Sequence, residues 1–478
     1  MKMKPSKLTK IAVAVSSCLA LIACDDDDST NEESFSAGEL RVIHASPDAP
    51  PVNVLLNGDE AIADLDYAQS TGFTQLNPGS YDIQVEGIIP GGNATVIDVP
   101  GFEITEESSP TVLAVNTVSS IEPIVVEESA STPEDNQVAI VVAHAAPVAG
   151  AVDVYLTAPG DDISRYSPAL SFDFKGSVDA GALDAGEVEI QVAIGGAVVY
   201  NSGAVDLTAF AGQSIMIVAL NSENETENSA SPIKLLVATD EMSLELTDVD
   251  TTAAARVVHA SPDAAAAAGG AVEVFATSAA LGTDPVELID GFNYTDVVPA
   301  TDSYVPVPQG AYTFDVAPDT DMIGDSVFTS DDLELMAGDE YTVIALGRVL
   351  GTPEFSLLPA EDDNRAIATQ GSVKLTHAAP AAGDVDVYVT AGGEYTTADI
   401  EAGIVSEPLI AGFAFGDATD YVAIAPGSYD IRVVAGGSVA INVEGLDVMG
   451  GDVLHAIARG PSEPSGSIAD FGVILLSN

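Results

Sequence analysis

A short phrase built around histidine and proline occurs four times along the chain, and this repetition constrains the fold more than any other feature. The first copy, Arg41 to Asp48, reads Arg-Val-Ile-His-Ala-Ser-Pro-Asp, and the later copies keep its His-Ala-x-Pro part. The histidines follow one another at intervals of 100 to 118 residues, and they are His44, His144, His259 and His377. Solenoid units repeat every ~20–50 residues, so this period indicates four whole domains in tandem.

A second phrase follows each first one, and in it apolar residues alternate with polar ones, as in Val52-Asn53-Val54. Such alternation places successive side chains on opposite faces of a β-strand. The apolar residues four and two positions before each histidine share its face, so we expect this face to lie in a core. The position three before the histidine is expected to be mostly solvated, and it is occupied by Arg41, Val141, Arg256 and Lys374.

Turn signals such as Pro-Gly-Ser-Tyr separate these short strands, and helical periodicity is absent outside the N-terminal segment. We therefore predict an all-β chain of four tandem Ig-like antiparallel β-sandwich domains, with about seven or eight strands each. Five extra residues of the third repeat fall in the Ala/Gly tract 264–270, which we expect to form a loop. The predicted repeats span 38–126, 138–240, 255–360 and 372–478, with linkers near 127–137, 241–254 and 361–371.

The N-terminal segment 1–23 is predicted to be a cleaved lipoprotein signal peptide. Four lysines precede a 12-residue, mostly apolar run that ends in Leu21-Ile22-Ala23-Cys24, and the run is too short to cross a bilayer as a helix. This ending resembles a bacterial lipobox, which implies lipidation of Cys24 and anchoring in a membrane. The alternative is an ordinary signal peptide with a chance cysteine. Residues 24–37 are acidic and polar, and they are predicted to form a disordered tether.

Charge excludes one class of partner. The chain has 14 Lys+Arg against 74 Asp+Glu, a formal net charge of −60, and such a surface repels nucleic acid. We expect weak, diffuse Ca²⁺ binding to this surface and no other cofactor. The alternative explanation of the charge is solubility in salty water.

The repeated phrases together resemble the bacterial and archaeal envelope family called domain of unknown function 4397. The resemblance runs almost end to end through the first repeat, over about 39–126, and covers the key phrases of the others. It departs in repeats two and four, where Ala146 and Ala379 replace the serine and the aspartate is also lost. The resemblance implies secretion and a β-rich domain, and it implies no known activity.

His44, Ser46 and Asp48 suggest a hydrolase, but neighbours at one strand end cannot all converge on one reacting atom. Because the sister repeats keep the histidine without the serine, we interpret the four histidines as structural residues whose ring nitrogens bond the backbone. No catalytic residue is predicted, and we expect the protein not to be an enzyme.

The sequence offers few candidate metal ligands that could converge on one ion. The repeat histidines lie in separate domains, so no zinc site is predicted, and only His377 and His455 could approach each other within one domain. The segment from Asp319 to Asp325 resembles the start of an EF-hand loop. However, Ile323 stands where an oxygen ligand belongs, and Ser330 replaces the closing glutamate.

In three repeats an aromatic residue lies two positions after the outward-facing polar residue of the second phrase, and it is therefore expected on the same outward face of the strand. These residues are Tyr155, Phe275 and Tyr388. They are candidate interface residues for sugar, with packing under a loop as the alternative. The expected function is that of a non-enzymatic, lipid-anchored cell-envelope protein acting as a spacer, adhesion or scaffold module. The alternative is a surface lipoprotein that binds carbohydrate or another small ligand. Expected partners are the membrane and a glycan or envelope protein, and either the outer-membrane surface or the periplasmic face fits.

Overall fold

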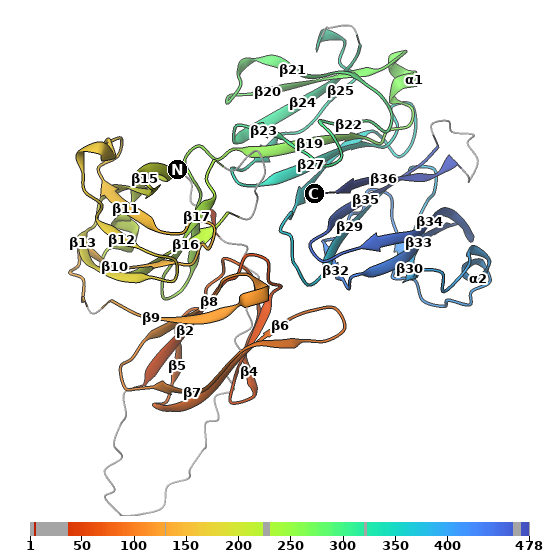
Figure 1. The fold of residues 1–478 in the computed structure, drawn as a ribbon. Helices are drawn as coiled ribbons and strands as arrows, with labels where there is room; N and C mark the ends of the chain where they lie inside the picture. Colours follow the sequence, from red (N-terminus) through yellow and green to blue (C-terminus); the bar gives the residue numbers. More distant parts are fainter. Residues whose placement is uncertain are drawn as a thin grey trace, which may run out of the picture. The chain divides into compact units, whose positions relative to one another are not determined.

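The computed structural model describes residues 4–5, 37–129, 131–222, 230–319, 323–461 and 470–477. The chain divides into two compact units, the first covering 1–222 and 231–249 and the second 223–230 and 250–478. The first unit therefore contains repeats 1 and 2, and the second contains repeats 3 and 4 (Figure 1). Cys24 and nearly all of the predicted leader and tether lie outside the described residues.

Repeat 1 is a sandwich of two four-stranded sheets, with strand orders β5-β2-β8-β9 and β4-β3-β6-β7. Its strands are β2 (Gly38–Ala45), β3 (Val52–Leu56), β4 (Asp59–Leu65), β5 (Thr74–Leu76), β6 (Gly79–Gly87), β7 (Ala94–Ile104), β8 (Pro110–Val115) and β9 (Glu122–Glu127). Strand β2 runs parallel to β8, and β8 runs antiparallel to β9. The start of β2 and the end of β9 therefore lie at the same end of the sandwich.

Repeat 2 has the same plan, with sheets ordered β18-β17-β16-β10-β13 and β12-β11-β14-β15, and the two-residue β1 (Lys4–Pro5) beside β18. Its strands are β10 (Gln137–His144), β11 (Val152–Thr157), β12 (Leu170–Phe172), β13 (Ser177–Asp184), β14 (Glu187–Ile194), β15 (Ala197–Asp206), β16 (Ser214–Asn221), β17 (Ile233–Ala238) and β18 (Ser243–Leu246).

Repeat 3 builds one sheet around β19-β27-β28 and a second in the order β21-β20-β24-β25. Its elements are β19 (Ala253–His259), α1 (Ala264–Ala268), β20 (Val272–Ser278), β21 (Gly282–Phe292), β22 (Val297–Val298), β23 (Val305–Val307), β24 (Gly310–Pro318), β25 (Phe328–Thr329), β26 (Leu333–Leu335), β27 (Glu340–Leu346) and β28 (Ser356–Asp362).

Repeat 4 has sheets ordered β32-β29-β35-β36 and β31-β30-β33-β34. Its elements are β29 (Gly371–Ala378), β30 (Val385–Ala391), α2 (Thr397–Glu401), β31 (Ile410–Phe413), β32 (Val422–Ile424), β33 (Gly427–Ala435), β34 (Ser438–Val448), β35 (Val453–Arg459) and β36 (Gly472–Ser477). Short 3₁₀ turns occur elsewhere: η1 (Val118–Ser120), η2 (Ile163–Arg165), η3 (Leu207–Phe210) and η4 (Ile323–Asp325). The all-β sandwich prediction is confirmed.

The first strand of each repeat is buried on both faces. On β2, Leu40 and Val42 pack inside the sandwich of repeat 1. Ile43 and Ala45 face the other way, into a cluster with Val141 and other residues of repeat 2. Val258 of β19 and Ala260, which follows the strand, likewise meet residues of repeat 4. Repeats 1 and 2, and repeats 3 and 4, are thus joined sheet against sheet; we call the two contacts the first and second joint.

This pairing overturns the expectation that the position three before each histidine is solvated. Arg41 and Arg256 are 0% exposed, Val141 is 2% exposed and Lys374 is 6% exposed. The expected alternation is present, but the face opposite the core is covered by the neighbouring repeat instead of water.

Two local expectations need correction. The segment 241–254 was expected to be a linker, but it contains β18. This strand pairs with β17 and so extends the sheet of repeat 2. The alanine tract forms the short helix α1 rather than a loop. Gly436 and Gly437 have φ of 58° and 86° and connect β33 to β34, which is the two-residue turn that a tight hairpin requires.

Candidate functional site

The repeated histidines hold the chain that follows their own strand. In repeat 1, the backbone N–H of Ser46 donates to Nδ1 of His44 at 3.3 Å, so the ring proton lies on Nε2. Nε2 then donates to the carbonyl oxygen of Pro50 at 3.0 Å. The same two bonds recur at His144, to Ala146 N (3.3 Å) and Gly150 O (2.6 Å), and at His377, to Ala379 N (3.2 Å) and Gly383 O (2.8 Å).

Burial keeps the rings of His144, His259 and His377 neutral. Desolvation lowers the pKa of His144 and His377, and it lowers the pKa of His259 to about 4. Aromatic rings pack around the imidazoles, such as Phe172 and Phe174 against His144. A neutral imidazole with both nitrogens engaged by backbone holds a loop in place and has no free site for proton transfer.

The aspartates of the phrase, and the serine of repeat 3, form hydrogen bonds away from the histidine, whereas Ser46 Oγ has no hydrogen-bond partner among the described residues. The Asp48 carboxylate accepts the backbone N–H of Val118, and Asp263 accepts those of Val349 and Leu350. Ser261 Oγ donates to the carbonyl of Gly347. Both acids therefore fasten the loop that follows the parallel neighbour of the first strand, and the described geometry does not form a Ser-His-Asp triad.

Replacing His44 with alanine is expected to destabilise the first unit by about 2–4 kcal/mol, because it removes a buried ring and leaves the Pro50 carbonyl without its donor. Calorimetry should show a fall of about 4–16 °C in the melting temperature of that unit. Ser46→Ala is the matched control, since repeat 2 carries Ala146 at this place. A His44→Ala protein that melts together with the control would contradict the structural role.

His259 departs from the pattern. Its Nδ1 accepts from Ser261 N at 3.3 Å, but among the described residues its Nε2 has no hydrogen-bond partner. The carbonyl six residues on belongs to Ala265, and it instead accepts the N–H groups of Gly269 and Gly270 at the end of α1. The five-residue insertion thus removes the bond that the other repeats make.

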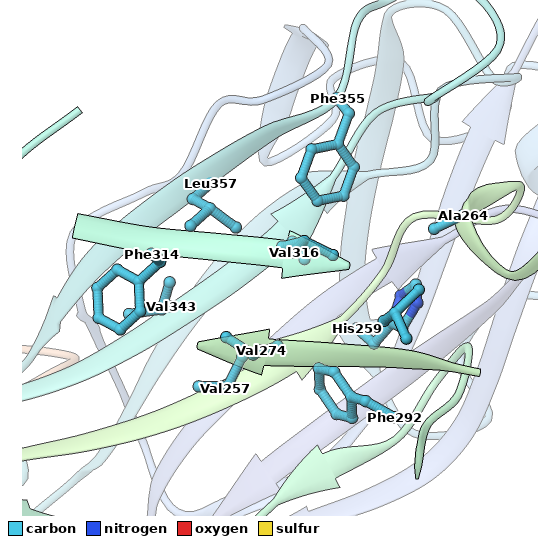
Figure 2. Close-up of a pocket in the computed structure, with 12 residues that line it drawn as sticks. Val257, His259, Ala264, Val274, Phe292, Phe314, Val316, Val343, Phe355 and Leu357 are labelled. Atoms are coloured by element: carbon cyan, nitrogen blue, oxygen red, sulfur yellow. The ribbon is translucent and has the colours of Figure 1, made fainter. Parts of the chain in front are cut away.

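A cavity of about 20 Å³ lies beside this ring in the core of repeat 3 (Figure 2). Its walls are apolar and include Phe292, Phe314 and Phe355. A second cavity of about 30 Å³ in the core of repeat 2 is lined by apolar residues alone. Neither cavity has room for more than one or two water molecules, and neither presents the converging polar groups that fix a ligand.

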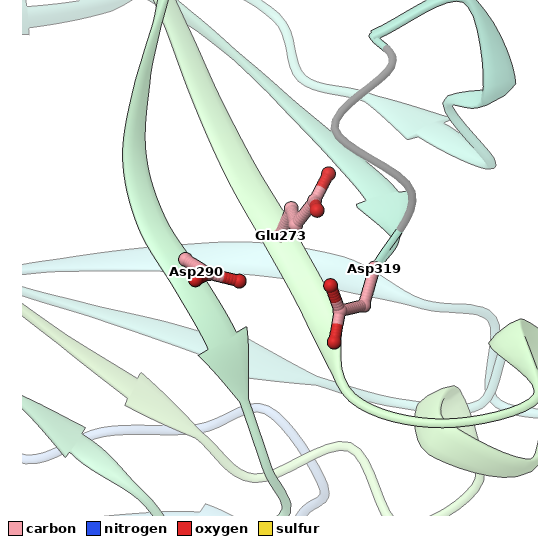
Figure 3. Close-up of side chains that lie close together, drawn as sticks. All are labelled: Glu273, Asp290 and Asp319. Carbon is pink, nitrogen blue, oxygen red and sulfur yellow. The ribbon is translucent and has the colours of Figure 1, made fainter.

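Three carboxylates approach one another at the edge of repeat 3. The ligand oxygens of Glu273, Asp290 and Asp319 lie within 4.8 Å of one another, with Glu273 buried and the two aspartates exposed (Figure 3). Asp319 opens the segment that resembles an EF-hand loop, of which 320–322 lie outside the described residues. Ca²⁺ takes six to eight oxygens, and this cluster supplies three side chains, so weak Ca²⁺ binding stays a prediction.

The aromatic candidates do not form an exposed platform. Tyr155 is 9% and Phe275 is 6% exposed, while Tyr388 is half-buried. The packing alternative therefore holds for the first two rings. Tyr388 on β30 is the register partner of Arg432 on β33, which is buried and bonds Asp430 at 3.2 Å.

Buried charge is concentrated at the joints, where no site was expected. In the second joint, Asp362 lies 3.6 Å from Arg256 and 3.8 Å from Lys374. The hydroxyls of Tyr304 and Tyr421 donate to it at 2.9 and 3.1 Å, and Thr342 Oγ1 also donates to it. We call these residues, together with His455, the Asp362 cluster.

Opposing effects act on the Asp362 carboxyl. Burial by itself would raise the pKa of Asp362, but the hydrogen bond from Thr342 and the charge of Arg256 act in the opposite direction and lower it. The group is therefore ionised at neutral pH, and it belongs to the segment 361–371 that was expected to be an acidic linker.

The first joint repeats the core of this arrangement. Arg41 pairs with Glu128, and its Nε donates to Thr111 Oγ1 at 2.9 Å. Arg256 donates to Thr342 in the same way, at 3.1 Å. The arginines also lie over aromatic rings, Phe73 at 4.5 Å and Tyr304 at 4.3 Å. The signal that could have revealed these sites is an arginine three residues before the histidine, followed by an acid at the end of the last strand.

His377 and His455 do not form a metal pair. His377 faces the core of repeat 4, against Phe413 and Phe415. The next residue along the strand towards the N-terminus, Thr376, faces the joint and lies 2.8 Å from His455 Nε2. The two histidines therefore lie on opposite faces of one sheet.

The fold and the recurring contacts define a class: tandem β-sandwiches, joined in pairs, whose repeated residues fasten backbone. The chain belongs to the family described as a domain of unknown function, DUF4397, which matches residues 38–155 and 253–388. None of the curated proteins compared with the chain matches it. No helix among the described residues has the length and apolar character needed to cross a membrane.

The two family matches cover equivalent stretches. Each begins in the first strand of a unit and ends at the tyrosine of the second phrase in the following repeat, Tyr155 or Tyr388. Both therefore continue across the boundary between paired repeats at the same place, which agrees with the pair as the larger repeated unit.

Proposed function

We propose that the protein is a non-enzymatic, lipid-anchored protein of the cell envelope that displays its paired sandwiches as a scaffold or adhesion module. One observation carries the proposal: the residues that recur in the repeats are engaged in holding backbone. The histidines bond carbonyls and amides of the following loop, and the aspartates bond the loop after β8 or β27. The residues that recur in the repeats thus serve to hold the loops of each sandwich in place.

The pairing favours a scaffold or adhesion module over a long spacer. The chain enters repeat 1 through β2 and leaves it through β9 at the same end of the sandwich. Repeats 1 and 2 then pack sheet against sheet, so a pair reaches less far than two sandwiches placed end to end. The alternative of a carbohydrate-binding lipoprotein now rests on Tyr388, because Tyr155 and Phe275 are buried.

Protease treatment of intact cells tests where the module is displayed. Loss of the protein, while a periplasmic control survives, would place it on the outer surface and direct the search to adhesion partners. Survival, together with digestion in lysed cells, would place it in the periplasm and favour a scaffold. Recovery of the protein in the cytoplasm would contradict the proposal.

Lipidation has its own test. Cys24→Ala, expressed with the native leader in a bacterium, is expected to move the protein from the membrane pellet to the soluble fraction, because two or three acyl chains provide the stable anchor. Cys18→Ala is the matched control, since Cys18 lies within the predicted leader and its loss should leave the protein in the pellet. A Cys24→Ala protein that stays with the membrane would rule out this anchor.

A further inference from the structure

His455 occupies an unusual position in the second joint. It lies on β35 and is 0% exposed. Its Nε2 is 2.8 Å from Thr376 Oγ1, while its Nδ1 is 3.6 Å from Asp362 Oδ1 and has no hydrogen-bond partner among the described residues. The ring is thus held at one nitrogen, and the other faces a carboxylate at a distance beyond hydrogen bonding.

The charges that face His455 come from three strands packed against it, whereas β36 places the apolar Leu476 opposite the ring. Arg256 on β19, Asp362 on β28 and Lys374 on β29 surround the ring, and Tyr304 and Tyr421 complete the shell around Asp362. Glu340, at the start of β27, is buried and is contacted by Asn364. Asp362 is already shared by two cations. An imidazolium would be a third cation on the same carboxylate, held out of water.

Burial lowers the pKa of His455, and Lys374 and Arg256 lower it further, against the opposing effect of Asp362. The ring is therefore neutral in the closed joint at neutral pH. Once the joint opens and water reaches the ring, His455 regains the ordinary histidine pKa of about 6.5.

The first joint contains a natural comparison. Lys374 and His455 are opposite each other in the register of β29 and β35, and Val141 and Met216 occupy the equivalent places on β10 and β16. Both of these residues are apolar and buried. The first joint therefore has no group at this position that can take up a proton.

We propose that the second joint is acid-sensitive: protonation of His455 opens the contact between repeats 3 and 4, and the contact between repeats 1 and 2 does not respond in this way. Protons favour the open form because it binds them and the closed form does not. Below about pH 6.5, each pH unit is expected to increase the open population by up to about tenfold.

Hydrogen exchange of the full chain, followed by mass spectrometry and corrected for intrinsic rates, tests this between about pH 7 and pH 5. The amides of β28, β29 and β35 are expected to lose protection by up to about tenfold per pH unit. The amides of β8, β10 and β16 in the first joint should keep theirs. Titration of His259 would instead loosen the core strands β20 and β24, and titration of His377 the core strands β30 and β33. The strands that lose protection therefore identify the group that titrates.

Two variants make the test decisive. His455→Met copies the first joint and is expected to abolish the acid response of the second. Met216→His makes the reverse change and is expected to give the first joint an acid response, which keeps the test valid if His455→Met fails to fold. An unchanged response in His455→Met, or equal acid responses of both joints in the wild-type chain, would overturn the proposal.

Discussion

Asp362→Asn is expected to destabilise the second unit by about 3–5 kcal/mol. The substitution keeps the size of the side chain and removes the negative charge that Arg256 and Lys374 both face. Removing one partner from a buried ionic group is strongly destabilising, because the remaining charge is left uncompensated in a medium that solvates it poorly. The loss should exceed that of any exposed ion pair, for which about 0–1 kcal/mol is typical.

Calorimetry of the full chain measures this effect. The transition of the second unit should fall by about 6–20 °C, while that of the first unit stays in place. Asp331→Asn is the matched control, because this aspartate lies in the same unit and is exposed. Glu128→Gln should move the other transition, through Arg41. If Asp362→Asn melts like Asp331→Asn, the Asp362 cluster does not hold the joint.

Acidification from pH 7 to pH 4 is expected to cost the second unit about 3 kcal/mol through His259 alone. Burial lowers the pKa of this ring from 6.5 to about 4 in the folded state, and a tenfold change in proton affinity on unfolding corresponds to about 1.4 kcal/mol. Between these two values the unfolded chain binds a proton that the folded chain does not, so stability falls as the pH falls and levels off below about 4. Desolvation lowers the pKa of His144 and His377 in the same direction.

Asp362 contributes in a different pH range. Its pKa is lowered in the folded state, so its stabilisation is complete above the unfolded value near 4 and is lost only as the pH falls below that value. The histidine and aspartate effects are therefore separable by pH.

Thermal melts from pH 7 to pH 4 in about 1 M salt, which shortens the Debye length to about 3 Å, isolate the histidine effect from the repulsion of the acidic surface. In His259→Asn, an amide oxygen replaces Nδ1 as the acceptor for Ser261 N. The stability of the second unit should then fall less steeply with decreasing pH, because the contribution of His259 is removed. Stability that stays level from pH 6.5 to pH 4 would contradict the neutral, buried state of the ring.

The sequence was sufficient to predict the features that depend on the residues of a single repeat. The period of two placed Leu40, Val42 and His44 on one face, and the structure buries that face in the sandwich. Copies of His-Ala-x-Pro without serine argued against the hydrolase hypothesis before any geometry was known. Those inferences depend on local patterning, which a strand carries in its own residues.

The expectations that proved wrong concern residues whose surroundings depend on contacts between repeats. Arg41 and Arg256 alternate with core residues and carry charge, so nothing local distinguishes them from solvated residues; only the neighbouring sheet, with its acid, buries them. Asp362 belonged to an apparent acidic linker for the same reason. The approach of Glu273, Asp290 and Asp319 is likewise set by the register of three chain segments, which a single sequence does not specify.

The sandwiches are expected to fold and act as pairs, and a core substitution in one repeat tests this most directly. Leu235→Ala removes a buried side chain from the core of repeat 2, a change that costs about 2–5 kcal/mol. Hydrogen exchange should show the slowest amides of β2 and β8 in repeat 1 losing protection together with those of repeat 2, while repeats 3 and 4 stay unchanged. Loss of protection confined to repeat 2 would contradict the pairing and define four independent domains.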